Sequence, residues 1–219
     1  MAACGLFVSC TQYGMVWATA GLRGPAESAV LSAMNTVLGF SNPVMNSSAW
    51  LLLMTATRSL AERGQVSTRE LTRPLLSSVV PLVGYWLALL ILPHVALTLV
   101  FGADSPYAQA SGALQLTTLF FATGYIAMCA ELLVDAAGKT RERLRVEASS
   151  ALLFTLAVVP ATYLAGFTGT MMTGIATQCV RAARLHRLAR PVWQRRSALE
   201  RTVRTEALTA SSLRAGIQH

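Results

Sequence analysis

Long stretches without a charged residue dominate the pattern of hydrophobic and polar positions along this chain. Residues 74–103 contain no Asp, Glu, Lys or Arg, and residues 107–130 repeat the pattern after a short turn at 104–106. Each stretch is longer than the ~20 residues that cross the hydrocarbon core of a bilayer. Because lipid offers no hydrogen-bond partners to the backbone, each stretch must form its own helix. The two stretches predict a transmembrane hairpin and therefore an integral membrane protein.

The other apolar segments extend the hairpin to an all-α integral membrane bundle of about six transmembrane helices. The predicted helices span residues 2–22, 27–57, 74–101, 107–134, 148–165 and 168–188. The last two share a single uncharged stretch, 148–180, which Pro160 and the turn at 166–169 divide. One long tilted helix is the alternative for this stretch, and it would place the C-terminal tail on the opposite side of the membrane.

The first segment has an alternative interpretation as a cleaved signal peptide. Ala18-Thr19-Ala20 resembles a small-residue cleavage site. No Lys or Arg precedes the apolar run, however, and Thr11, Gln12 and Tyr13 interrupt it. These features favour a retained helix, and cleavage stays open as the second possibility.

The charged residues predict the orientation of the bundle. The chain carries a net charge of +8, and its Arg residues gather in the loops at 58–73 and 139–147 and in a tail at 191–219. Basic loops beside apolar segments stay in the cytoplasm, so we expect both termini to be cytoplasmic. Arg23 alone falls on the outer side. The six-helix domain thus covers residues 1–190, and the Arg-rich tail either lies on anionic lipid or extends freely.

The composition argues for a multi-pass protein of the cytoplasmic membrane and against several other classes. Hydrophobic residues make up 53% of the chain and charged residues only 13%, against about 25% in soluble proteins. The clustering of the Arg residues beside apolar segments favours orientation signals over nucleic-acid binding. The four cysteines form no C-x-x-C pair, and no hydrolase, phosphate-loop or acidic metal motif is present. We therefore predict neither an enzyme nor a cofactor or metal site.

Polar side chains recur on one side of the predicted helix 27–57. Asn35, Asn42 and Asn46 share a face with Ser28, within about 40° of one another at 100° per residue. Pro43 predicts a kink directly after Asn42. The amides either bond neighbouring helices or face a wet cavity, and the sequence leaves both interpretations open.

The predicted helix 107–134 carries a second polar face and a pair of acids at its cytoplasmic end. Gln115 and Thr118 lie on this face and are candidates for the same cavity. Glu131 and Asp135 stand four residues apart beside the basic loop, so pairing with Arg is expected of them rather than acid–base catalysis.

Several motifs from residue 58 onward resemble the polysaccharide-export branch of the multidrug/oligosaccharidyl-lipid/polysaccharide exporter superfamily, which includes the Wzx-type O-antigen flippases of lipopolysaccharide synthesis. A helix ends in LTLVFG at 97–102, and SPYAQA at 105–110 is similar to the family's turn into the next helix. LLVDAAGKT at 132–140 resembles a helix end with its inner loop. The run from AGFTG to IAT at 165–177 is similar to the junction before the last helix of a lobe.

The resemblance implies one six-helix lobe, similar to the C-terminal lobe of a two-lobed flippase. It implies a partner, either a second six-helix lobe or another copy of the chain, and a half-length or truncated member of the family. By this resemblance the protein transports a lipid-linked oligosaccharide or polysaccharide precursor. Substrate contacts are then expected at the polar faces: Asn35, Asn42, Asn46, Gln115 and Thr118. The alternative function is a non-transporting membrane scaffold of a cell-envelope glycan assembly complex.

Overall fold

A computed structural model of the protein describes residues 2–63 and 68–216, and it describes side-chain surroundings for residues 13–62 and 76–190. The side chain of Gln12, part of the basic loop 58–73 and the side chains of the tail lie outside what the structure describes. Within these ranges the chain is helical and contains no β-strand. The helices are α1 (Ala2–Arg23), α2 (Pro25–Gly39), α3 (Asn42–Arg63), α4 (Thr68–Ile91), α5 (Pro93–Phe101), the short 3₁₀ helix η1 (Pro106–Gln109), α6 (Ser111–Ala136) and α7 (Thr140–Gly216).

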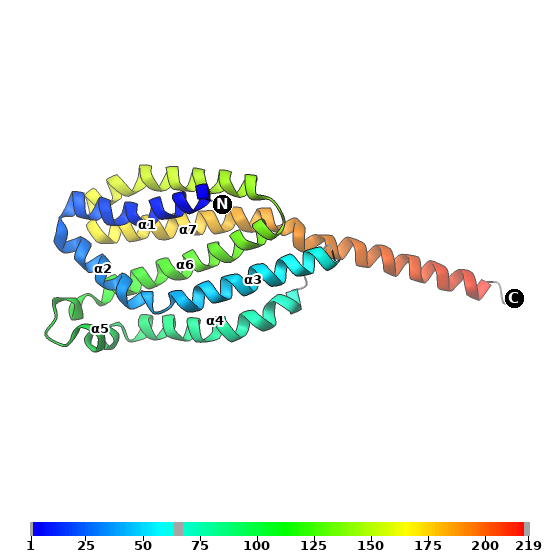
Figure 1. Ribbon diagram of the computed structural model, residues 1–219, viewed down its shortest axis with the longest axis horizontal. Coiled ribbons are helices and arrows are strands. Elements are labelled where there is room, and N and C mark those ends of the chain that lie inside the picture. The colour runs from blue at the N-terminus through cyan, green and yellow to red at the C-terminus, as the bar shows by residue number, and fades with distance from the viewer. Residues whose placement is uncertain (1, 64–67, 217–219) are drawn as a thin grey trace.

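The helices stack side by side around α6, which packs against α2, α3, α4, α5 and α7 (Figure 1). The two largest of four clusters of buried side chains in the described residues show how the helices are joined. The first joins α2, α4 and α6 through Met34, Leu38, Trp86, Leu114 and Tyr125. The second joins α1, α6 and α7 through Met15, Phe120, Phe154 and Met171. Helix α6 therefore contributes side chains to both clusters.

Helix α7 reverses direction at Gly166, where the backbone leaves the helical region (φ 57°, ψ −138°). The first limb, 140–165, and the second limb, 167–216, run antiparallel (Figure 1). Thr162 and Thr170 join them by a hydroxyl–hydroxyl bond of 2.7 Å close to the turn. Arg181 reaches back to Glu147 farther along. Two separate limbs, rather than one long tilted helix, thus occupy the uncharged stretch 148–180.

Two or three segments of the described chain are long and apolar enough to cross a membrane. These are α6, the part of α7 from Thr140 to Arg190, and the bent pair Leu76–Ile91 with Pro93–Phe101 if the pair forms one span. The prediction of an all-helical chain is therefore confirmed for the described residues, and two or three of its segments could cross a membrane. Six crossings and the cytoplasmic location of both termini stay predictions.

The predicted helix 74–101 is not continuous, which corrects the sequence-based expectation. It breaks at Leu92, and the axes of its two parts differ by 94°. Pro93 lacks an amide hydrogen, so it cannot continue the hydrogen-bond ladder, and it instead becomes an early residue of α5.

The predicted helix 27–57 also divides, close to the expected kink. Phe40 and Ser41 form a turn between α2 and α3, immediately before Asn42 and Pro43. The Ser41 hydroxyl donates to the Leu38 carbonyl at 2.6 Å. The same carbonyl also accepts from the backbone amide of Ser41 at 2.9 Å, so both donors of Ser41 close the end of α2.

Candidate functional site

The candidate site is a cleft between α1 and α3, lined at its base by α6 and the second limb of α7. It consists of two adjoining cavities of about 250 and 280 Å³. Asn42, Phe120 and Phe121 line both cavities and so join them. The first cavity extends from this junction toward Tyr13 of α1. The second extends toward Arg181 of α7.

The three predicted asparagines of α2 and α3 all line this cleft. Asn35 lies in the first cavity, Asn46 in the second and Asn42 in both. Asn42 and Asn46 are exposed, and Asn35 is half-buried. Within the described chain, no hydrogen bond from these three side chains to another residue is present. Their amides are therefore available to a ligand, although the chain breaks between Asn35 and Asn42.

The two predicted residues of α6, Gln115 and Thr118, do not line either cavity. Their side chains bond backbone carbonyls of the helices instead. Gln115 donates its side-chain amide to the carbonyl of Leu90 at 2.9 Å. That carbonyl lies in the last turn of α4, beside the break at Leu92. Thr118 is fully buried and donates to the carbonyl of Leu114 at 2.8 Å. Thr117, the neighbour of Thr118, lines the first cavity.

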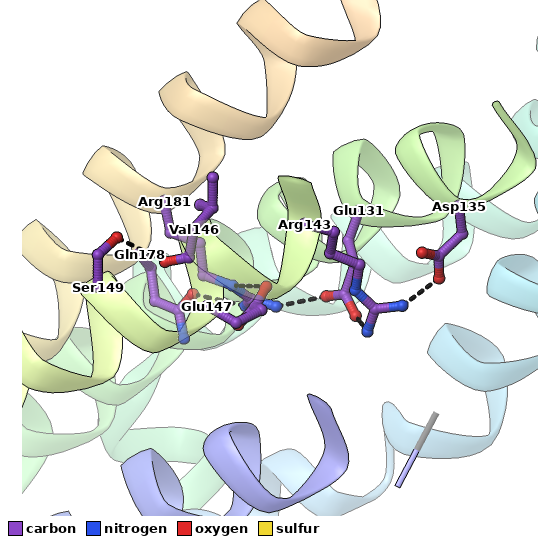
Figure 2. A network of polar contacts seen from close by, with 8 residues as sticks. All are labelled: Glu131, Asp135, Arg143, Val146, Glu147, Ser149, Gln178 and Arg181. Carbon is purple, nitrogen blue, oxygen red and sulfur yellow. Dashed lines mark hydrogen bonds and ion pairs between the residues drawn. The ribbon is translucent and has the colours of Figure 1, made fainter. Parts of the chain in front are cut away.

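A network of charged side chains occupies the far end of the cleft (Figure 2). Arg143 of the first α7 limb lies between Asp135 and Glu131 of α6 and pairs with both. Arg181 of the second limb pairs with Glu131 and, at 2.7 Å, with Glu147 of the first limb. The order of charges is therefore acid, base, acid, base, acid. The network ties α6 to both limbs of α7.

The network is largely withdrawn from solvent. The side chains of Arg181 and Glu147 are 8% and 4% exposed, and that of Asp135 is 20% exposed. Arg181 also donates to the side-chain oxygen of Gln178 at 3.1 Å. Glu131, Gln178 and Arg181 line the second cavity. A ligand in the cleft would thus meet the network directly.

The sequence predicted part of this network. The expected pairing of Glu131 and Asp135 with Arg is confirmed, and Arg143 is the partner of both. The participation of Glu147 and Arg181 was not predicted, because each stands at one end of an uncharged stretch and resembles an ordinary interfacial charge. Their distance of 34 positions in the sequence becomes a contact only through the reversal at Gly166.

A second polar contact holds the opposite end of the α7 hairpin. Arg23, the last residue of α1, donates to the carbonyls of Thr162 and Tyr163 at 3.1 and 2.8 Å. Glu27 of α2 accepts from the amide of Phe167 at 2.9 Å. A cation thus caps the C-terminal end of the first limb, and an anion caps the N-terminal end of the second. This contact gives Arg23 a structural role that is independent of its side of the membrane.

No family model, curated protein or solved structure matches this chain. The described residues contain no group of three or more His, Cys, Asp or Glu side chains arranged to hold a metal ion. The arrangement itself defines a helical bundle with an amide-lined cleft that ends in a buried network of ion pairs. Such a cleft can hold a polar group by neutral hydrogen bonds along its length and by charge at its far end.

Proposed function

We propose that the protein is a multi-pass membrane protein that carries the polar head of a lipid-linked oligosaccharide or polysaccharide precursor across the cytoplasmic membrane. In this proposal it forms one lobe of a flippase-like transporter and is completed by a second lobe or by another copy of the chain. Two lobes that rock about a shared cleft would give alternating access. The following observations support the proposal.

The distribution of side chains suits a lipid environment. Large apolar side chains are exposed along the outer faces of α4, α6 and α7, whereas polar and charged groups lie inside the bundle. Examples are Leu87, Ile91, Ile126, Leu156, Val159 and Leu164. A soluble monomer rarely exposes apolar area of this extent, whereas a membrane helix must do so. In this proposal the six crossings place the basic loops and both termini in the cytoplasm.

The cleft suits a ligand with a hydrated head and an apolar anchor. The amides of Asn35, Asn42 and Asn46 can donate to and accept from sugar hydroxyls or a pyrophosphate. Tyr13 lines the first cavity, and Tyr13, Trp17 and Trp50 are exposed aromatic side chains of α1 and α3. Such side chains combine an apolar ring with a polar group. The lipid tail would stay in the bilayer while the head enters the cleft.

Asn42 carries the proposal, because it is the one polar residue common to both cavities. Replacement of Asn42 by Leu removes a donor and an acceptor at the centre of the path. A hydrogen-bond loss of ~1–3 kcal/mol corresponds to a reduction of the transport rate by about 5-fold to 150-fold. The measurement is the movement of a fluorescent lipid-linked oligosaccharide between leaflets of vesicles that contain the purified full chain.

The matched control is Ser47→Leu, which adds the same apolar side chain to an exposed position of α3 outside both cavities. We expect Ser47→Leu to transport at the wild-type rate. Equal rates for Asn42→Leu and the wild type would contradict a substrate path through the cleft. No movement by the wild-type chain would contradict transport by this lobe alone or as a homodimer.

The scaffold function is the second candidate, because α7 continues well beyond the bundle. Its helical backbone extends to Gly216 and projects away from the other helices (Figure 1). A projecting basic helix can hold a partner of a cell-envelope glycan assembly complex. Under this alternative, deletion of residues 191–219 abolishes assembly of the complex, whereas Asn42→Leu leaves assembly intact.

A further inference from the structure

The buried network at the end of the cleft contains unequal numbers of opposite charges. It holds the three carboxylates of Asp135, Glu131 and Glu147, but only the two guanidinium groups of Arg143 and Arg181. With all five side chains ionised, the network would carry one uncompensated negative charge. A buried charge without compensation is strongly unfavourable, and a protein usually neutralises it.

Asp135 is the carboxylate where the compensation is weakest. Its Oδ2 accepts from Arg143, whereas its Oδ1 is buried and has no hydrogen-bond partner. By contrast, both oxygens of Glu131 accept from a guanidinium, one from Arg143 and one from Arg181. Glu147 also accepts from one guanidinium, that of Arg181 at 2.7 Å, but neither of its oxygens is both buried and without a hydrogen-bond partner.

Among the side chains that the structure describes, the remaining charged groups on the elements around the network are directed elsewhere or lie in water. Lys139 is half-buried, and its Nζ donates to the carbonyl of Leu188 at 3.2 Å. The exposed groups are Arg141, Glu142 and Arg145 on the first limb, Arg184, His186, Arg187 and Arg190 on the second limb, and Arg58 and Glu62 on α3. Arg184 donates to Ser149, and Arg58 pairs with Glu62. Exposed charges are screened by water and compensate a buried carboxylate poorly.

The geometry favours a proton over a metal ion as the compensating charge. A metal ion needs several oxygen ligands that converge on one point. The carboxylates of the network instead alternate with guanidinium groups, and the described residues contain no converging set of three or more acidic, His or Cys side chains. A proton needs only one carboxylate oxygen, and Asp135 offers an unbonded one.

We propose that Asp135 is a proton-binding site that holds one exchangeable proton at neutral pH. Protonation of Asp135 leaves two carboxylates for two guanidinium groups, so the rest of the network becomes neutral. The Oδ1 atom itself is buried, but the side chain of Asp135 is 20% exposed, so solvent lies next to the carboxyl group that holds the proton. Two other members of the network, Glu131 and Arg181, line the cleft. Gain or loss of the proton therefore changes the charge that the cleft presents.

Infrared spectroscopy of the purified full chain at pH 7 tests the proposal, because a protonated carboxylic acid has a C=O stretch that a carboxylate lacks. We expect this band in the wild type and its loss in Asp135→Asn. The matched control is Asp104→Asn, because Asp104 is exposed in the turn before η1, far from the network in the sequence. The control should retain the band in full.

The charge count gives a second, stricter test. Glu147→Gln leaves two carboxylates for two guanidinium groups, so Asp135 should ionise and the band should vanish although Asp135 itself is intact. Arg181→Gln leaves three carboxylates for one guanidinium, so the band should grow about twofold. Because Asp135 is intact in Glu147→Gln and Arg181→Gln, these two variants test the proposal even if Asp135→Asn fails to fold.

Absence of the band from the wild type would overturn the proposal, as would a band that persists in Asp135→Asn. A band that is indifferent to both Glu147→Gln and Arg181→Gln would overturn the role of the network in holding the proton. None of these measurements needs a substrate, so their outcome is separate from that of the transport assay.

Discussion

At the scale of single residues, Arg181 pairs with two carboxylates and also bonds a neutral side chain. It joins Glu131 of α6, Glu147 of the first α7 limb and Gln178 of its own limb. A guanidinium has five donors in a planar fork and stays protonated, so it suits a buried position between two carboxylates. The side chain therefore fixes the relative positions of three helical segments.

Replacement of Arg181 by Gln should lower the free energy of unfolding by about 3–5 kcal/mol, because it leaves buried carboxylates without their partner. The double variant Arg181→Gln with Glu147→Gln should lose less than the sum of the two single variants. Thermal unfolding of the protein in detergent, under identical conditions for all variants, measures both effects.

Arg184→Gln is the matched control, since Arg184 is exposed and makes one bond, to Ser149. We expect a change within about 0.5 kcal/mol for this surface substitution. An Arg181→Gln protein as stable as the control would show that the network does not hold α6 and α7 together.

At the scale of helices, the close approach of the two α7 limbs depends on Gly169. A Cβ atom at this position would lie 2.1 Å from the carbonyl oxygen of Ala161 on the other limb. The contact is with backbone, so no side-chain rotation can relieve it. The hairpin can therefore keep its present spacing only with glycine at position 169.

Replacement of Gly169 by Ala should force the limbs apart and lower the free energy of unfolding by about 1–3 kcal/mol. The matched control is Gly84→Ala in α4, where an added Cβ meets nothing within 4 Å. The control should be neutral or stabilising by up to about 1 kcal/mol, because Ala favours helices over Gly. Thermal unfolding in the same detergent compares the two, and equal stabilities would contradict the tight hairpin.

The prolines show which part of this element structure the sequence could predict. Pro81 and Pro160 lie inside continuous helix, whereas Pro43 and Pro93 follow breaks. Sequence alone predicts a bend at each of these positions, because every proline removes one amide donor. Whether the helix breaks depends on neighbours such as Gln115, which takes the free carbonyl of Leu90 beside the 94° break. That partner is distant in the sequence, so the break could not be predicted.

The candidate site shows the same limit. The asparagine stripe on residues 35–46 was visible as a helical spacing, and all three amides line the cleft. Gln115 and Thr118 also lie on a polar face, yet their hydrogen bonds go to backbone carbonyls. Periodicity shows which residues share a face, but it does not show which of them a neighbouring backbone uses.

At the scale of the whole molecule, the charge pattern predicts which loops lie on each side of the membrane. A single cysteine at position 104 should react with an impermeant thiol reagent in intact cells, and one at position 141 only after permeabilisation, because basic loops stay in the cytoplasm. Both positions are exposed. The native cysteines are replaced first, and the parent without cysteine is the control. Labelling of position 141 in intact cells would contradict the proposed orientation.

The ion-pair network also bears on how the chain enters a membrane during synthesis. An ionised side chain raises the cost of inserting a lone helix, by about 3 kcal/mol at the helix centre and by less near its ends, and α6 and both α7 limbs each bring part of the network. Arg181 follows its partner Glu131 by 50 residues, which at about 5–20 residues per second takes roughly 3–10 s to synthesise. If these segments span the membrane as proposed, we expect α6 to stay beside the insertion machinery until the hairpin emerges, so that the charges pair before the three segments enter the lipid.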